Sequence, residues 1–181
     1  MPITASIIVI SDLALADPAE DRGGPVALDA LRAAGVEVLD YALVAADLTD
    51  ASHAIDAALA RGSRVVLTIG STGVGASDIV VEASRPLLTA ELPGIAEAIR
   101  RRGEQHQSQS LLSRGLAGVV VRAGCAAMVV NAPSSRGGVR DTLDVVVPLL
   151  PHIIDQLDGR DRHDHDQPVH DTDRHSRGGT T

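Results

Sequence analysis

Residues Arg64 to Glu82 read RVVLTIGSTGVGASDIVVE, and this stretch decides the fold. Its first part, Val65 to Ile69, is an apolar run rich in β-branched residues, which predicts a buried strand. A glycine loop follows from Gly70 to Gly75, and Asp78 and Glu82 lie where we expect a helix to start. Glycine permits positive φ angles and a close approach of the backbone to a ligand. A strand, a glycine loop and a helix start together gather several N–H groups, an arrangement that suits an anion such as phosphate.

A simpler interpretation of the glycine loop is a tight turn capped by Asp78, and for a lone glycine loop this is the commoner case. Two familiar phosphate motifs are excluded. The P-loop ends in Gly-Lys-Ser/Thr, but this chain has no lysine, since all 16 of its Lys+Arg residues are Arg. The dinucleotide fingerprint is G-x-G-x-x-G, whereas the spacing here is G-x-x-G-x-G. A phosphate bound here must therefore be neutralised by backbone dipoles, arginine or a metal ion.

Composition narrows the class of protein. The length of 181 residues suggests one domain, and an apolar content of 44% is enough for a core. That core must be aliphatic, because the chain has no Phe or Trp and one Tyr. The net charge of -8 argues against a nucleic-acid partner. Cys125 is the single cysteine, so no intrachain disulfide can form, and its apolar neighbours predict that it is buried.

The sequence also bears on location. No apolar stretch reaches transmembrane length, and the N-terminus MPITASIIVISD lacks the basic region of a secretory signal. We therefore expect a cytoplasmic protein with no membrane partner.

Apolar periodicity predicts alternating strands and helices. Strands are expected at residues 6–10, 36–44, 65–69, 119–121 and 126–131. One helix should begin at Pro25 and stop at Gly35, and another should take Asp50 as its N-cap and end at Gly62. Further helices are expected at residues 95–102 and from Val139 to Leu157, the last with a bend at Pro148. This alternation indicates an α/β fold with a mainly parallel sheet and helices on both faces.

Four of the predicted strands end in polar loops. These are Ser11-Asp12, the loop at Asp47, Gly70 to Asp78, and Pro133 to Gly138. Parallel strands place such loops at one edge, where α/β proteins bind ligands. The last loop also precedes a helix, which makes it a second candidate anion site with Arg136 beside it. Two anion sites and several carboxylates at one edge suggest a polyphosphate with a divalent cation.

The character of the chain changes near residue 160. We expect residues 1–159 to form the domain and residues 160–181, rich in His, Asp and Arg, to form a disordered tail, since they contain almost nothing apolar. His163, His165 and His170 could bind a metal, although without a fixed scaffold adventitious binding is the better interpretation.

Several motifs together resemble one family. They are ISD at Ile10 to Asp12, EDRGGP at Glu20 to Pro25, and then LTIGSTGVGASD, ELPGIAEAIR, LLSRGLAGV and NAPSSRGGVRDTL. In order and spacing they resemble the MoaB/MogA family of molybdenum cofactor biosynthesis proteins, which is related to the G domain of gephyrin. The similarity runs from Ile7 to Leu157.

This resemblance implies a three-layer α/β/α sandwich, usually a homotrimer with a hexamer as the alternative. It also makes other proteins of the pathway candidate partners. It implies binding of molybdopterin and, in the MogA-type branch, its adenylylation with Mg²⁺ and ATP. Asp47 and Asp78 match the two essential acidic positions and are the implied catalytic residues and Mg²⁺ ligands. The implied substrate and phosphate contacts are Ser11, Asp12, Gly70, Ser71, Thr72, Gly73, Gly75, Glu82, Pro133, Ser134, Ser135, Arg136 and Gly137.

Three departures from the family pattern leave alternatives open. Ser71 replaces the second glycine of Gly-Gly-Thr-Gly, which is expected to put a side chain where the backbone would approach phosphate. Val80-Val81-Glu82 replaces Thr-Pro-Glu, and Pro133 to Arg136 replaces Pro-Gly-Ser-Pro, where loss of the glycine would strain the loop if it needs a positive φ. A non-catalytic molybdopterin-binding or scaffold protein is the second hypothesis. A nucleotide-binding α/β protein unrelated to molybdenum is the third.

Overall fold

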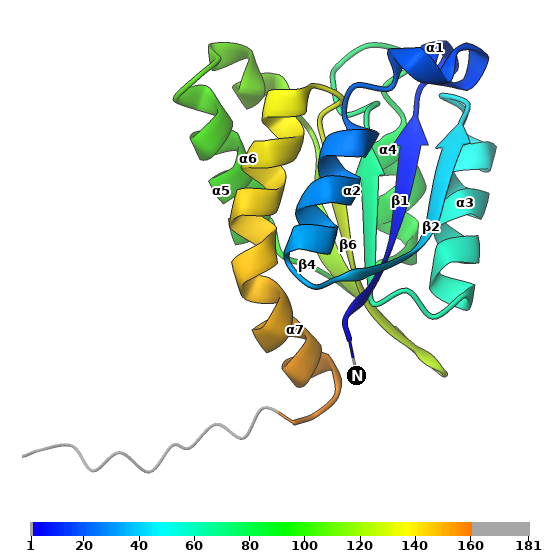
Figure 1. Ribbon diagram of the computed structural model, residues 1–181, viewed down its shortest axis with the longest axis vertical. Helices are drawn as coiled ribbons and strands as arrows, with labels where there is room; N and C mark the ends of the chain where they lie inside the picture. Colours follow the sequence, from blue (N-terminus) through cyan, green and yellow to red (C-terminus); the bar gives the residue numbers. More distant parts are fainter. Residues whose placement is uncertain (1, 161–181) are drawn as a thin grey trace, which may run out of the picture.

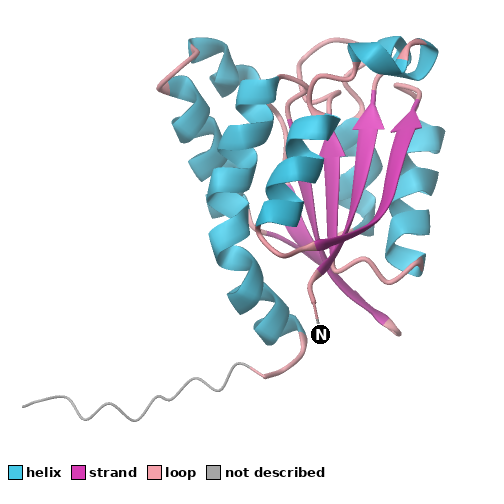
Figure 2. Ribbon diagram, in the orientation of Figure 1, coloured by secondary structure: helices cyan, strands magenta, loops and turns pink. Residues whose placement is uncertain are grey.

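The structure is a computed structural model that describes residues 2–160, so nearly all of the predicted tail lies outside the described residues. Its centre is a six-stranded sheet in the order β2-β1-β3-β6-β5-β4 (Figures 1 and 2). Four strands are mutually parallel, namely β1 (Thr4–Ile10), β2 (Glu37–Val44), β3 (Val65–Ile69) and β6 (Cys125–Ala132). The antiparallel edge consists of β5 (Ala117–Arg122) and β4 (Ala90–Glu91). The predicted mainly parallel α/β fold is confirmed.

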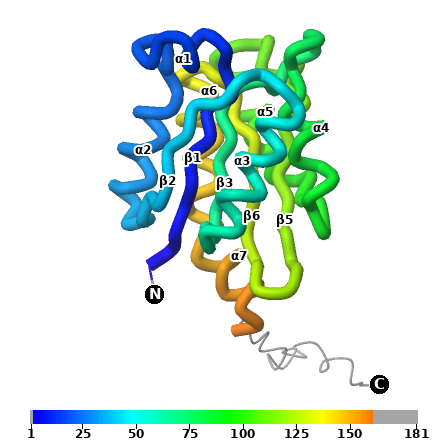
Figure 3. The backbone as a smooth tube through the Cα atoms, turned by 90° about the vertical axis from the view of Figure 1, so that its right-hand side faces the viewer, coloured from blue at the N-terminus to red at the C-terminus, as the bar shows by residue number. Residues whose placement is uncertain are grey.

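Helices cover both faces of the sheet, which gives three layers. One face carries α1 (Asp12–Ala16), α2 (Gly24–Ala33), α5 (Pro93–Glu104), α6 (Arg136–Val146) and α7 (Leu150–Leu157). The other carries α3 (Leu48–Ala60) and α4 (Val80–Ser84), and Figure 3 shows α3 lying over the sheet from that side. Short 3₁₀ helices occur at η1 (Pro18–Glu20), η2 (Arg85–Leu87), η3 (Ser108–Leu112) and η4 (Val147–Leu149). No helix in residues 2–160 is long and apolar enough to cross a membrane.

The core is aliphatic, as composition required. Alternate residues of β1 point to opposite faces, so Ile7 and Val9 join the core on one side while Ile8 and Ile10 join the core on the other. A parallel sheet must be covered on both faces, and each fully buried Ile contributes about 1.5–3 kcal/mol. Two continuous apolar layers therefore hold the sheet and fix the positions of its strand ends.

Two local predictions are wrong. The N-cap of α3 is Asp47 rather than Asp50, because the carboxylate of Asp47 accepts hydrogen bonds from the amides of Thr49 and Asp50. Cys125 is partly exposed rather than buried, because it opens β6 directly after the β5–β6 hairpin turn. Both errors occur at element boundaries, which the apolar pattern defines poorly.

The register of the strands brings the predicted loops together. Val9 pairs with Ile69, and Ile69 pairs with Ala132, so β1, β3 and β6 end at nearly the same level. Ile10 pairs with Val44 at the end of β2. The loops that follow these four strands consequently lie at one edge of the sheet, the upper edge in Figure 1.

Candidate functional site

The glycine loop and the Pro133–Gly138 loop adjoin at this edge. The amide of Gly70 donates a 2.9 Å hydrogen bond to the carbonyl of Ala132, and Gly70 has a φ of +100°. A Cβ at position 70 would lie 2.6 Å from the carbonyl oxygen of Ile10 and 3.8 Å from the Cβ of Ser134. Only glycine fits where the ends of β1, β3 and β6 approach so closely.

A cleft of about 660 Å³ opens beside these two loops. Six of the predicted contact residues line it: Thr72, Gly73, Pro133, Ser134, Ser135 and Gly137. Its opposite side is formed by residues of α5, η3 and α6. The volume is in the usual range for a site that binds a small molecule.

The glycine loop has unused hydrogen-bonding groups beside the cleft. Among the described residues, the amides of Thr72 and Gly73, which line the cleft, and of Val74, which is exposed, donate no hydrogen bond. Thr72 is 6% exposed, and its hydroxyl also has no hydrogen-bond partner within residues 2–160. Buried polar groups normally have partners, so Thr72 is suited to contact with a ligand that accepts hydrogen bonds.

Ser71 stabilises the loop from inside. It is the single non-glycine residue of the described chain with a positive φ, at 56°. Its hydroxyl donates to the carbonyl of Ser77 at 2.6 Å and accepts from the amide of Ile79 at 2.7 Å. The side chain that replaces the family's glycine is therefore bound within the loop and is not directed at a ligand. Ser134, by contrast, has no positive φ, so the expected strain in the second loop is absent.

Asp78 lies against the glycine loop and does not cap a helix. α4 begins at Val80 with Ile79 at the N-cap position and no side-chain capping bond. The Asp78 carboxylate instead accepts a 2.8 Å hydrogen bond from the amide of Gly75. A Cβ at Gly73 would lie 2.7 Å from the same carboxylate oxygen. The two glycines thus let a carboxylate pack directly on the loop backbone.

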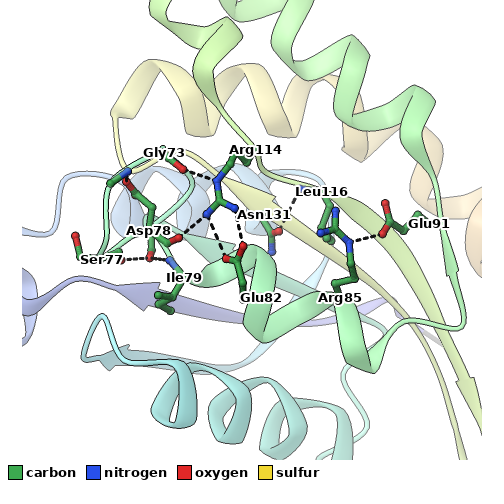
Figure 4. A network of polar contacts seen from close by, with 12 residues as sticks. Gly73, Ser77, Asp78, Ile79, Glu82, Arg85, Glu91, Arg114, Leu116 and Asn131 are labelled. Carbon is green, nitrogen blue, oxygen red and sulfur yellow. Dashed lines mark hydrogen bonds and ion pairs between the residues drawn. The ribbon is translucent and has the colours of Figure 1, made fainter.

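Arg114 fixes this loop, a role that the sequence analysis missed. Its Nε donates to the carbonyl of Gly73 at 2.7 Å, and its Nη2 donates to the carbonyl of Asp78 (Figure 4). Its own amide donates to the carbonyl of Thr72 at 2.8 Å. Glu82 completes the arrangement through two contacts with the guanidinium, at 2.6 and 3.2 Å. The hydrogen bonds from Arg114 lower the pKa of the Glu82 carboxyl. The LLSRGLAGV motif, which contains Arg114, was the feature of the sequence that could have indicated a role for this residue.

The second loop is built on a helix start. Ser135 is the N-cap of α6 and its hydroxyl accepts a 3.0 Å hydrogen bond from the amide of Gly138. A Cβ at Gly138 would lie 2.7 Å from the Cβ of Pro133, which explains the glycine. Arg136 is exposed and, with Arg22 and Ser135, lines a separate hollow beside the cleft.

Three predicted residues lie beyond the cleft, over the ends of β1 and β2. Ser11 caps α1, the carboxylate of Asp12 accepts from the amide of Ala46 at 2.9 Å, and Asp47 caps α3. β2 and β3 are two strand spacings apart, or roughly 10 Å. Asp47 is thus at the same edge as Asp78, and neither carboxylate is part of the cleft lining.

The EDRGGP turn packs against the same edge. Asp21 accepts hydrogen bonds from the amides of Gly23 and Gly24 at 3.2 and 2.8 Å, and from the hydroxyl of Tyr41. Burial, together with the hydrogen bond to Asp21, raises the pKa of Tyr41. A Cβ at Gly23 would lie 2.8 Å from Ile69 and 3.0 Å from the carbonyl oxygen of Ser134, so the turn packs on both loops of the site.

The residues offer part of a magnesium site. Asp47 and Asp78 each use one carboxylate oxygen for backbone amides, and the other oxygen has no hydrogen bond from the described residues. No group of three His, Cys, Asp or Glu side chains in residues 2–160 could hold a metal ion alone. Magnesium typically takes one or two carboxylates and completes its shell with substrate phosphates and water, so these residues fit it together with a bound polyphosphate.

The chain is similar in sequence and in fold to several known proteins. A family model described as a probable molybdopterin binding domain matches residues 6–152. The chain is 35% identical over 159 residues to a molybdenum cofactor biosynthesis bifunctional protein of Synechococcus elongatus, covering 88% of this chain and 49% of that protein. It thus spans about half the length of this relative. It is 31% identical to molybdenum cofactor biosynthesis protein B of Staphylococcus aureus, covering 86% of this chain and 92% of that protein. The crystal structure of a molybdopterin biosynthesis protein from Mycobacterium abscessus superposes with a TM-score of 0.79 at 35% identity, covering 86% of this chain and 96% of that one.

Proposed function

The chain belongs to the probable molybdopterin binding domain family, and we propose that its step in molybdenum cofactor biosynthesis is the Mg²⁺- and ATP-dependent adenylylation of molybdopterin. The family membership confirms the resemblance that the motifs indicated. The observation that supports this step is the junction of the glycine loop and the Pro133–Gly138 loop beside one cleft, with the Asp78 carboxylate on the glycine loop.

In this proposal the phosphate of molybdopterin attacks the α-phosphorus of ATP, and pyrophosphate leaves. Such chemistry needs positioning and charge stabilisation more than it needs a covalent nucleophile. The amides of Thr72 to Val74 and the Thr72 hydroxyl would hold one phosphate group. The N-terminus of α6 and the hydroxyl of Ser134 would hold a second.

Asp47 and Asp78 are the residues that would hold Mg²⁺, each through the carboxylate oxygen that the backbone leaves unused. A magnesium ion held there would supply positive charge that neutralises the phosphate groups. Arg114 keeps the glycine loop in place, and Glu82 balances its charge.

The test is an assay with purified protein, molybdopterin, Mg²⁺ and ATP that measures adenylyl-molybdopterin and pyrophosphate. We expect Asp78→Asn and Asp47→Asn each to lower turnover by about 10²-fold or more, the usual loss when one charge-stabilising group is removed. Asn caps helices as well as Asp, so α3 should survive the second change. Asp50→Asn, exposed in the first turn of α3, is the matched control. Full activity in both site variants would contradict the assigned roles.

A non-catalytic molybdopterin-binding or scaffold protein is the second candidate. Ser71 favours it, because this residue departs from the family's loop and ties the loop to Ser77 and Ile79. This candidate requires molybdopterin binding without pyrophosphate release, and detection of adenylyl-molybdopterin would exclude it.

We also propose that the protein assembles as a homotrimer. An apolar groove between α5 and α7, lined by Leu92, Ile95, Val145, Leu149 and Ile153, is a surface that association would cover. Surfaces of this kind often mark contacts between proteins.

A further inference from the structure

The side of the cleft away from the two phosphate loops contains a buried carboxylate. Asp141 of α6 lines the cleft and is 8% exposed. Gly103 of α5 and Ser110 line the cleft beside it, since a Cβ at Gly103 would lie 2.5 Å from the hydroxyl oxygen of Ser110 and 3.5 Å from an oxygen of Asp141. The carboxylate is therefore part of the cleft wall, next to Gly103 and Ser110.

Asp141 has too few partners for a buried charge. One carboxylate oxygen of Asp141 lies 3.5 Å from Nε of Arg102, which is its ion pair. No described residue donates a hydrogen bond to this carboxylate. Arg102 makes its closer ion pair with Asp144, which is half exposed. A buried carboxylate normally accepts several hydrogen bonds, and leaving it without them is costly. The deficit in a ligand cleft points to a ligand that donates.

We propose that Asp141 recognises the pterin ring of the substrate by accepting hydrogen bonds from its amino group and the adjacent ring N–H. A pterin presents these two donors side by side, and a carboxylate has two acceptor oxygens at matching spacing. Adenine presents an amino group between acceptor nitrogens and matches less well. The inference rests on the proposed function, and it assigns the ring to the α5–α6 side of the cleft and the phosphate to the loop side.

The test is calorimetric titration with hydroxymethylpterin phosphate, with its lumazine counterpart, and with ATP. Lumazine has a carbonyl oxygen in place of the amino group. At the ring edge that would face Asp141 it therefore offers one N–H donor and one carbonyl oxygen, which the carboxylate repels. Wild-type protein should bind the pterin roughly 10- to 100-fold more tightly than the lumazine, the range expected for a hydrogen bond to a charged group. Asp141→Asn is isosteric and should lose most of this preference. The wild-type preference tests the inference even if the variant fails to fold.

Asp144→Asn is the matched control, because Asp144 shares Arg102 with Asp141 but is half exposed. It should keep the preference for the pterin. An equal loss in both variants would mean that the aspartates act by holding Arg102, which would overturn the inference. Equal binding of pterin and lumazine by the wild type, or weakened ATP binding with unchanged pterin binding in Asp141→Asn, would also overturn it. If the wild-type protein binds neither the pterin nor the lumazine compound, both the inference and the proposed function fail. If it turns over molybdopterin but does not prefer the pterin to the lumazine, only the inference about Asp141 fails.

Discussion

Replacing Ser71 separates two opposing effects in the glycine loop. Ser71→Ala removes hydrogen bonds to Ser77 and Ile79 but keeps a side chain at a φ of 56°. Two hydrogen bonds at about 0.5–1.5 kcal/mol each give a loss of about 1–3 kcal/mol in the free energy of unfolding. Ser71→Gly loses the same bonds but removes the left-handed strain, worth about 1–2 kcal/mol, at an entropic cost of about 0.5–1 kcal/mol. We therefore expect Ser71→Gly to be less destabilised than Ser71→Ala by about 1 kcal/mol.

Urea unfolding followed by far-ultraviolet circular dichroism is the suitable assay, since the chain has no Trp for fluorescence. At an m-value of about 2 kcal/mol/M, a loss of about 2 kcal/mol moves the midpoint by about 1 M. Ser77→Ala is the matched control, because Ser77 contributes its carbonyl and not its side chain. It should stay within about 0.5 kcal/mol of wild type. A neutral Ser71→Ala, or a Ser71→Gly that is the less stable of the two, would refute the account of the loop.

Three further outcomes are expected. Tyr41, the single tyrosine, has a pKa raised above 10.0 by burial and by Asp21, so its stabilising contribution is complete below pH 10 and is lost as the pH rises toward the folded-state value. Its ultraviolet titration should be displaced upward in the native protein and should be absent from Tyr41→Phe, which has no phenol, and a native titration at the usual pH would contradict this. Arg114→Lys should speed hydrogen exchange and proteolysis in residues 71–79, since one ammonium cannot reach the carbonyl of Gly73 and its other acceptors together, whereas Arg122→Lys, a surface pair with a single carboxylate, should not. Light scattering should give three times the chain mass of 18.7 kDa, and a monomer at micromolar concentration would count against the trimer.

The sequence predicted the parallel half of the fold because its information is local. β-branched runs such as Val65 to Ile69 and the apolar pattern of Ile7 to Ile10 correspond to strands buried on both faces. The two-residue strand β4, Ala90–Glu91, escaped prediction because it depends on pairing with β5 and has no periodicity of its own. The N-cap of α3 was misplaced because Asp47 and Asp50 are both suitable residue types, and only the backbone path decides between them.

The sequence predicted the loops of the site but not the side chains elsewhere in the chain that contact these loops or line the cleft. Polar residues after apolar strands identified the glycine loop and the Pro133–Gly138 loop, and parallel geometry placed them at one edge. Arg114 was missed because it lies far along the chain from Gly73. The LLSRGLAGV motif draws attention to this segment, but a local motif does not show which distant carbonyls the guanidinium will reach. Asp141 was missed for a related reason, since a carboxylate in an amphipathic helix looks like a solvated charge until the packing of α5 on α6 buries it.

A crystal structure with Mg²⁺ and a non-hydrolysable ATP analogue tests the phosphate-binding edge most directly. We expect phosphate oxygens within hydrogen-bonding distance of the amides of Thr72 and Gly73, with the Asp78 carboxylate on the metal ion. Phosphates bound elsewhere on the molecule, with those amides facing only water, would contradict the account.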